Sequence, residues 1–123
     1  MKALVVDDSR AIRMIIARQL KSLGFSIVEA NDGREALAAL RSVGPFDIAL
    51  VDWNMPVMNG LELVLEVRSD RSLDEMAIMM VTTESEQTQV IRAIEAGASE
   101  YLMKPFSPEA FEEKLVILGL KAA

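Results

Sequence analysis

The stretch LVDWNMP at residues 50–56 decides the fold, because it is an apolar run that ends on a carboxylate, Asp52, and then turns at Asn54 and Pro56. An apolar run without polar alternation is typical of a strand that is covered on both faces of a parallel sheet. A carboxylate at the end of such a strand is rarely kept without a partner. The stretch therefore raises the question of which groups lie beside Asp52.

Four further short runs of strand type occur along the chain, and apolar residues recur every three or four positions between them. The five runs are 3–6, 26–30, 47–51, 77–81 and 100–103. The helical periodicity is carried by Ile12, Ile15, Ile16, Leu20 and Leu23, by Ala36, Leu37 and Leu40, by Leu61, Val64 and Leu65, by Val90, Ile91 and Ile94, and by Phe111, Leu115 and Leu118. This alternation predicts an α/β fold, a doubly wound five-stranded parallel sheet with helices on both faces.

Composition narrows the functions that such a fold could have. The 123 residues fit one domain, which we expect to span 1–123. The chain has no Cys and no His, which excludes disulfides, thiol nucleophiles and the commonest general base. A net charge of −6 argues against binding nucleic acid. No apolar run reaches the ~20 residues that cross a membrane, so we expect a soluble cytoplasmic protein with no membrane partner.

Polar side chains follow four of the five runs, at the edge where parallel strands present their carboxyl ends to a ligand. They are Asp7 and Asp8, Asp52, Thr82 and Thr83, and Lys104. Three carboxylates gathered at one edge repel one another unless a cation lies between them. Oxygen ligands in this small number favour Mg²⁺ over Ca²⁺. With that metal bound, one aspartate could attack a phosphoryl group while Thr82 and Lys104 hold its oxygens.

Each of these motifs also has an ordinary structural explanation. The Asp-Asp-Ser after a strand is most often a helix N-cap in a solvated turn, and paired threonines commonly serve turns. A lone Lys-Pro is usually a loop, and the eight methionines are better explained as core filler. The conjunction of these groups at one edge, and no single motif, is what favours a phosphoryl-transfer site.

The chain resembles the response-regulator receiver domains of bacterial two-component signalling, most closely the stand-alone chemotaxis regulators of the CheY type. The strings that carry the resemblance are VVDDS at 5–9, LVDWNMPVMNG at 50–60, VTTE at 81–84 and AGASEYLMKPF at 96–106. The resemblance covers essentially the whole chain. It implies a flavodoxin-like sheet with the strand order 2-1-3-4-5.

The same resemblance implies the phosphorylation and metal sites. Asp52 would be the phosphoacceptor, and Asp7 and Asp8 would form the acidic pocket. Mg²⁺ would be bound in this pocket through Asp8, Asp52 and the main-chain carbonyl of Asn54. Lys104 would contact the phosphoryl group, and the bond from Lys104 to Pro105 is often cis in this family.

Residues around that pocket would transmit and time the signal. Thr82 would shift toward the phosphoryl group, and Tyr101 would be the aromatic switch that follows it. Asn54 and Glu84 occupy positions that tune hydrolysis in the family and imply a moderate rate. Thr83 stands where the family often has a smaller residue such as alanine, so we expect slower phosphorylation and slower hydrolysis.

By this resemblance the chain is a phosphorylation-activated switch and not a turnover enzyme. Because it lacks His, a sensor histidine kinase or a small acyl phosphate must supply the phosphoryl group. The helix that begins within 84–89, the strand 100–103 and the helix that begins at Ser107 would repack and bind a downstream protein, in chemotaxis or in a phosphorelay. We expect a monomer, with a phosphatase as a further partner. Docking to a flagellar motor protein stays open, because only Arg92 gives that first helix a positive charge.

Several alternatives stay open. The chain could be a receiver cut from a longer regulator. A phosphatase of the haloacid-dehalogenase type uses a similar pocket, but it needs an aspartate two residues after its nucleophile, where this chain has Ser9 or Asn54. A flavodoxin-like cofactor binder would have a phosphate cradle instead of DDSR in its first loop. An inert scaffold would respond neither to Mg²⁺ nor to phosphodonors.

Overall fold

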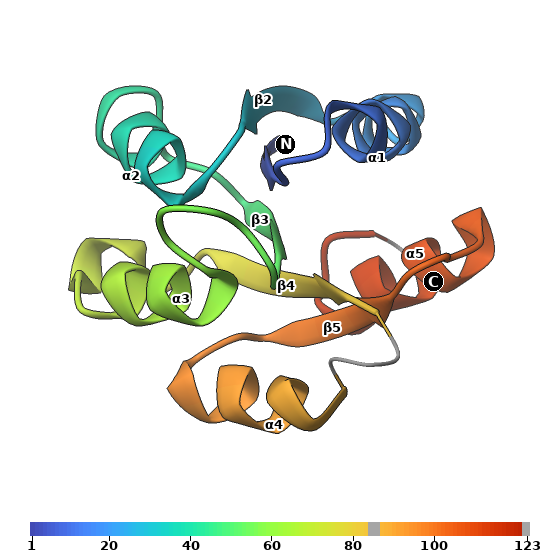
Figure 1. Ribbon diagram of the computed structural model, residues 1–123. Coiled ribbons are helices and arrows are strands. Elements are labelled where there is room, and N and C mark those ends of the chain that lie inside the picture. Colours follow the sequence, from blue (N-terminus) through green and yellow to red (C-terminus); the bar gives the residue numbers. More distant parts are fainter. Residues whose placement is uncertain (84–86, 122–123) are drawn as a thin grey trace.

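The computed structural model describes residues 1–83 and 87–121, which form one parallel sheet with helices on both sides (Figure 1). The elements are β1 (Lys2–Val6), α1 (Arg10–Ser22), β2 (Ser26–Ala30), α2 (Gly33–Ser42), β3 (Ile48–Asp52), α3 (Gly60–Arg68), the short 3₁₀ helix η1 (Arg71–Leu73), β4 (Ala77–Thr82), α4 (Gln87–Ala96), β5 (Glu100–Met103) and α5 (Pro108–Ile117). The strand order is β2-β1-β3-β4-β5, and all paired strands are parallel. The predicted fold class and strand order are confirmed.

The two sides of the sheet carry separate hydrophobic cores. In Figure 1, α1 and α5 lie on one side of the sheet, and α2, α3 and α4 lie on the other. Successive residues of β3 alternate between the two cores: Ile48 and Leu50 pack with the α1/α5 side, whereas Ala49 and Val51 pack with the other. Because side chains alternate across a strand, a central strand with two buried faces must be apolar throughout. This is why the run before Asp52 shows no polar alternation.

Four helices begin with a side-chain cap, as expected for segments that follow a turn. Ser9 and Asp32 accept hydrogen bonds from the third residue of α1 and of α2, and Ser107 does the same for α5. Asn59 and Glu62 form a capping box at the start of α3. The cap in the Asp-Asp-Ser motif is thus the serine, which leaves both aspartates available for other partners.

The sequence prediction was wrong about several helical faces. Ile15 is 50% exposed, Leu65 is 53% exposed, and Ile91 and Ile94 are 66% and 42% exposed, although the periodicity had grouped them with core residues. A helix that lies on a sheet hides only one stripe of its surface, and this stripe cannot be told from an adjacent apolar row by sequence spacing. The buried side chains of α3 are those of Leu63, Val64 and Val67, and those of α4 include Val90 and Ala93.

Within the described ranges, 1–83 and 87–121, no helix is both long enough and apolar enough to cross a membrane.

Candidate functional site

The carboxyl ends of β1, β3, β4 and β5 bring four of the predicted side chains to one edge of the sheet. Asp7 follows β1, Asp52 and Thr82 are the last residues of β3 and β4, and Lys104 follows β5. Asp7, Asp52 and Thr82 are 1%, 5% and 0% exposed, and they are the buried polar or charged residues of the described part of the chain. Asp8, which follows Asp7 in the chain, is exposed. The parallel register fixes this assembly, because Asp52 pairs with Val81 and Thr82 pairs with Met103.

Lys104 joins two of these carboxylates. Its Nζ lies 3.0 Å from Asp52 Oδ1 and 3.3 Å from Asp7 Oδ2. The main chain holds the residue in place, since Lys104 N–H donates to the carbonyl of Thr82 at 2.6 Å. The peptide bond between Lys104 and Pro105 is cis. Lys104 therefore neutralises part of the negative charge of the cluster from the side of β5.

Burial controls the charge of Asp52. Burial raises the pKa of Asp52 from 3.8 to about 6, with a further increase from the negative charge of Asp7, and these effects outweigh the hydrogen bond from Lys104, which lowers the pKa. Burial alone would lower the pKa of Lys104, but its hydrogen bond and ion pair with Asp52 and Asp7 raise it above the usual value. Lys104 thus stays charged. Asp52 is also ionised at neutral pH, but burial makes its negative charge unfavourable, and a second cation beside it would offset this cost.

The geometry of the carboxylates fits a hard divalent cation. One oxygen from each of Asp7, Asp8 and Asp52 lies within 4.8 Å of the other two. Mg²⁺ is bound in proteins by a few carboxylate oxygens and keeps several waters, which suits a site with two buried carboxylates and one exposed one. Asn54, the other predicted ligand, is exposed in the loop after β3.

Thr82 has an unusual environment. Its Oγ1 is one of two buried side-chain polar atoms that lack a hydrogen-bond partner in the described residues, the other being Gln19 Oε1. A buried hydroxyl without a partner is costly and rare in native structures. The hydroxyl is available for an acceptor that is brought to the edge of the sheet.

The loop between β3 and α3 is tight at the point where it leaves Asp52. A side chain at Gly60 would bring its Cβ within 2.7 Å of the Asp52 carbonyl oxygen and 2.9 Å of Trp53 Cα, so the start of α3 approaches the strand end as closely as only glycine permits. In the same loop Val57 has φ of 71°, at the centre of a turn closed by the hydrogen bond from Met58 N–H to the Pro56 carbonyl. A β-branched residue with positive φ stores backbone strain, of order 1–3 kcal/mol.

Two further predicted residues lie in β5 and directly after β4. Tyr101 lies in β5, is partly exposed and packs against the core on the α4 side of the sheet. Thr83 is exposed directly after β4. Glu84 lies outside the described residues, so its predicted part in hydrolysis stays a prediction.

Two residues that support the site, Arg13 and Ser9, were not predicted from the sequence. Arg13 of α1 donates to the main-chain carbonyl of Asp7 and to the side chains of Glu29 and Asn31, which ties the first loop to the end of β2. The N–H of Ser9 donates to Asp7 Oδ1 at 2.8 Å, which orients that carboxylate. The sequence shows Arg13 only as a charge on a helix, because its partners are 16 and 18 residues away in the chain.

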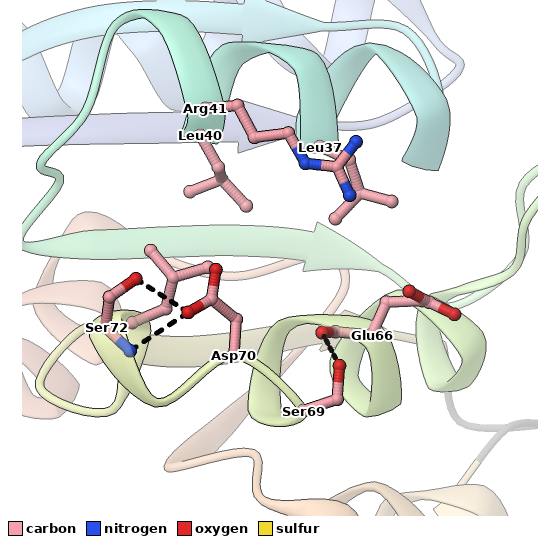
Figure 2. Close-up of a pocket in the computed structure, with 8 residues that line it drawn as sticks. Leu37, Leu40, Arg41, Glu66, Ser69, Asp70 and Ser72 are labelled. Atoms are coloured by element: carbon pink, nitrogen blue, oxygen red, sulfur yellow. Dashed lines mark hydrogen bonds between the residues drawn. The ribbon is translucent and has the colours of Figure 1, made fainter.

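A cavity of about 340 Å³ lies at the opposite end of the sheet, between the last turns of α2 and α3 (Figure 2). Two pairs of its lining residues hydrogen-bond within each pair: Asp70 accepts from the N–H and hydroxyl of Ser72, and the Ser69 hydroxyl donates to the carbonyl of Glu66. None of the carboxylates of the cluster lines it. The candidate site is therefore the carboxylate edge and not this cavity.

Comparisons with known proteins agree with this site. The sequence pattern of the response regulator receiver domain matches residues 3–116, so the chain belongs to the family of response regulator receiver domains. Within that family it is similar to chemotaxis proteins called CheY. It is 47% identical to chemotaxis protein CheY1 of Helicobacter pylori over 121 residues, and this aligned stretch covers 97% of this chain and 98% of the relative. It is 44% identical over 116 residues to chemotaxis protein CheY of Pseudomonas aeruginosa, covering 94% and 93%.

A solved structure shows the same likeness in three dimensions. Chemotaxis protein CheY4 of Vibrio cholerae superposes with a TM-score of 0.86 at 39% identity, covering 95% of this chain and 97% of that one. The predicted family and its likeness to CheY are confirmed. The chain is a CheY-like receiver domain, which is consistent with phosphorylation-dependent signalling.

Proposed function

We propose that this receiver is a switch that accepts a phosphoryl group on Asp52, in a site that holds Mg²⁺ through Asp7, Asp8, Asp52 and the main-chain carbonyl of Asn54. The observation that carries the proposal is the ion pair between Lys104 and Asp52, a carboxylate only 5% exposed, inside a cluster of three carboxylates. Of the three, Asp52 alone ends the central strand, and the burial that raises its pKa also favours a cation beside it.

The residues of the site divide the chemistry of transfer. An oxygen of Asp52 attacks the phosphorus of a phosphohistidine on a sensor kinase; the P–O bond forms, the P–N bond breaks, and the leaving imidazole nitrogen takes up a proton. Bound Mg²⁺ would screen the charge of the incoming phosphoryl oxygens. Lys104 turns from Asp52 to a phosphoryl oxygen as the carboxylate charge is replaced, and the Thr82 hydroxyl donates to another.

The output follows from how these residues are connected to the rest of β4 and β5. Thr82 and Lys104 share a main-chain hydrogen bond, so a shift of one moves the other. Tyr101 lies three residues before Lys104, and exposed Ile91 and Ile94 lie on neighbouring α4. We propose that the face of α4, β5 and α5 repacks on phosphorylation and binds a downstream protein, with exposed isoleucines as apolar contacts.

We propose that the chain acts on its partners as a signal and not as a turnover enzyme. Its own chemistry is limited to taking the phosphoryl group from a kinase or an acyl phosphate and losing it to water. A partner phosphatase would shorten the lifetime of the signal. The names of its relatives favour chemotaxis as the pathway in which it acts.

Intact mass spectrometry after incubation with acetyl phosphate tests the proposal. The wild type should gain one labile phosphoryl group when Mg²⁺ is present, and Asp52→Asn should gain none. Asp47→Asn is the matched control, because Asp47 is an exposed aspartate at the amino end of β3. Trp53, the only tryptophan, should report the same event by a change in fluorescence. A wild type that gains no mass, or an Asp52→Asn variant that gains as much, would refute the proposal.

A further inference from the structure

Three side chains form a compact group at the outer edge of β5. Lys114 Nζ, from α5, lies 2.9 Å from Glu100 Oε1 and 4.6 Å from the centroid of the Tyr101 ring. The same Glu100 oxygen accepts a hydrogen bond of 3.0 Å from the N–H of Tyr101. One carboxylate thus holds both the ammonium that faces the ring and the main chain that carries the ring.

The group is partly buried and lies on the edge strand of the sheet. The side chains of Lys114 and Glu100 are only 24% and 18% exposed, so solvent screens them less than it screens an ordinary surface pair. β5 is the last strand of the sheet, and charged side chains commonly protect such an edge from pairing with another chain. Edge protection needs only a charge, however. It does not need an ammonium placed within cation–π distance of one ring.

We propose that Lys114 is a positioning residue for Tyr101: together with Glu100 it holds the ring where it lies in the unmodified chain, and it thereby opposes the rearrangement that phosphorylation of Asp52 drives. The inference rests on the proposed function, in which Tyr101 responds to the phosphorylation site. It adds a restraint supplied by α5, on the side of β5 away from Thr82.

The contact would therefore set the relative populations of the two positions of the Tyr101 ring. If the contact favours one position of the ring, its loss raises the population of the other position. By thermodynamic reciprocity, the same loss must tighten the binding of any group that favours the other position. A partly exposed cation–π contact predicts a change of roughly two- to five-fold in both quantities.

The chain allows a direct measurement, because Tyr101 is its only tyrosine and 3-fluorotyrosine would give a single ¹⁹F resonance. We would record this resonance with and without beryllium fluoride and Mg²⁺, as a stable mimic of the phosphoryl group. Lys114→Met removes the ammonium and keeps most of the side-chain length, and Lys114→Arg restores a cation. Lys121→Met makes the same charge change at an exposed lysine after α5 and serves as the control.

A second readout separates a shift in population from a direct effect of the lost charge on the resonance. The concentration of beryllium fluoride that gives half of the Trp53 fluorescence change should fall roughly two- to five-fold in Lys114→Met. It should return toward the wild-type value in Lys114→Arg and stay unchanged in Lys121→Met.

The outcomes are distinguishable. If the wild-type resonance and fluorescence do not respond to the mimic, the proposed function itself fails. If the wild type responds but Lys114→Met needs the same concentration of mimic as the wild type, the proposed function stands and the restraint by Lys114 is refuted, leaving edge protection as the explanation.

Discussion

The two ends of the sheet each hold a partly buried cation, and the two cations have different partners. At the carboxyl end, Lys104 contacts the carboxylates of Asp7 and Asp52. At the amino end, Arg68 closes α3 and donates to four main-chain carbonyls, those of Gly97, Leu73, Asp74 and Met76, at 2.8–3.3 Å. Burial lowers the pKa of Arg68, whereas the carboxylates raise that of Lys104.

The difference teaches what each cation can do. A main-chain carbonyl is neither protonated near neutral pH nor phosphorylated, so these chemical changes leave the hydrogen bonds of Arg68 to the turns before β4 and β5 in place. A carboxylate can be protonated, can bind a metal and can be phosphorylated, so the partners of Lys104 can be changed by chemistry. We infer that Arg68 stabilises the fold, and that Lys104 belongs to the switch.

The largest effect on stability is expected at Arg68. Arg68→Ala should lower the free energy of unfolding by about 3 kcal/mol, because four carbonyls lose a charged donor in a partly buried place. Urea titration measures this change, and Arg71→Ala, at an exposed arginine nearby, should cost less than about 0.5 kcal/mol. The folded variant should still gain a phosphoryl group. A loss of stability below about 1 kcal/mol would remove the contrast between the two cations.

Substitution of Asp52 should raise the free energy of unfolding, in contrast to substitution of Arg68. Because its pKa is raised from 3.8 to about 6, the folded state binds the proton more tightly than the unfolded state. The resulting stabilisation is complete below the unfolded value and is lost as the pH rises through about 6. Asp52→Asn should therefore be more stable than the wild type by about 2 kcal/mol at pH 8, and the gain should disappear near pH 4. A gain that does not depend on pH would show that charge is not its cause.

The smallest effect is expected at Lys104. Lys104→Met should lower the free energy of unfolding at pH 8 by about 1 kcal/mol, since uptake of a proton by Asp52 limits the cost of leaving it unpaired. In the Asp52→Asn background the loss should shrink by more than half, as a double-mutant cycle measures. Mg²⁺ should restore stability to Lys104→Met, because a second cation replaces the ammonium. An equal loss of stability in both backgrounds would show that the contribution of Lys104 does not depend on the charge of Asp52.

The same comparison explains what the sequence could predict. The carboxylate edge was predictable, because each of its residues directly follows or ends an apolar run and parallel strands carry their ends to one place. Arg68 was not, since an arginine in the last turn of a helix is ordinary in sequence and its four acceptors are main-chain groups, which have no sequence signal. Lys114 was missed for a related reason: its contacts with Glu100 and Tyr101 depend on how α5 lies against β5. The exposure of Ile91 depends likewise on the rotation of α4 about its axis.

The most direct test of the central claim is to locate the phosphoryl group. Reduction with borohydride converts an aspartyl phosphate to homoserine, which peptide mass spectrometry assigns to a position in the chain. After incubation with acetyl phosphate and Mg²⁺, the account predicts homoserine at position 52, none at 7 or 8, and none when Mg²⁺ is omitted. Homoserine at Asp7 or Asp8, or at no position in a wild type treated in this way, would contradict the claim that Asp52 is the phosphoacceptor.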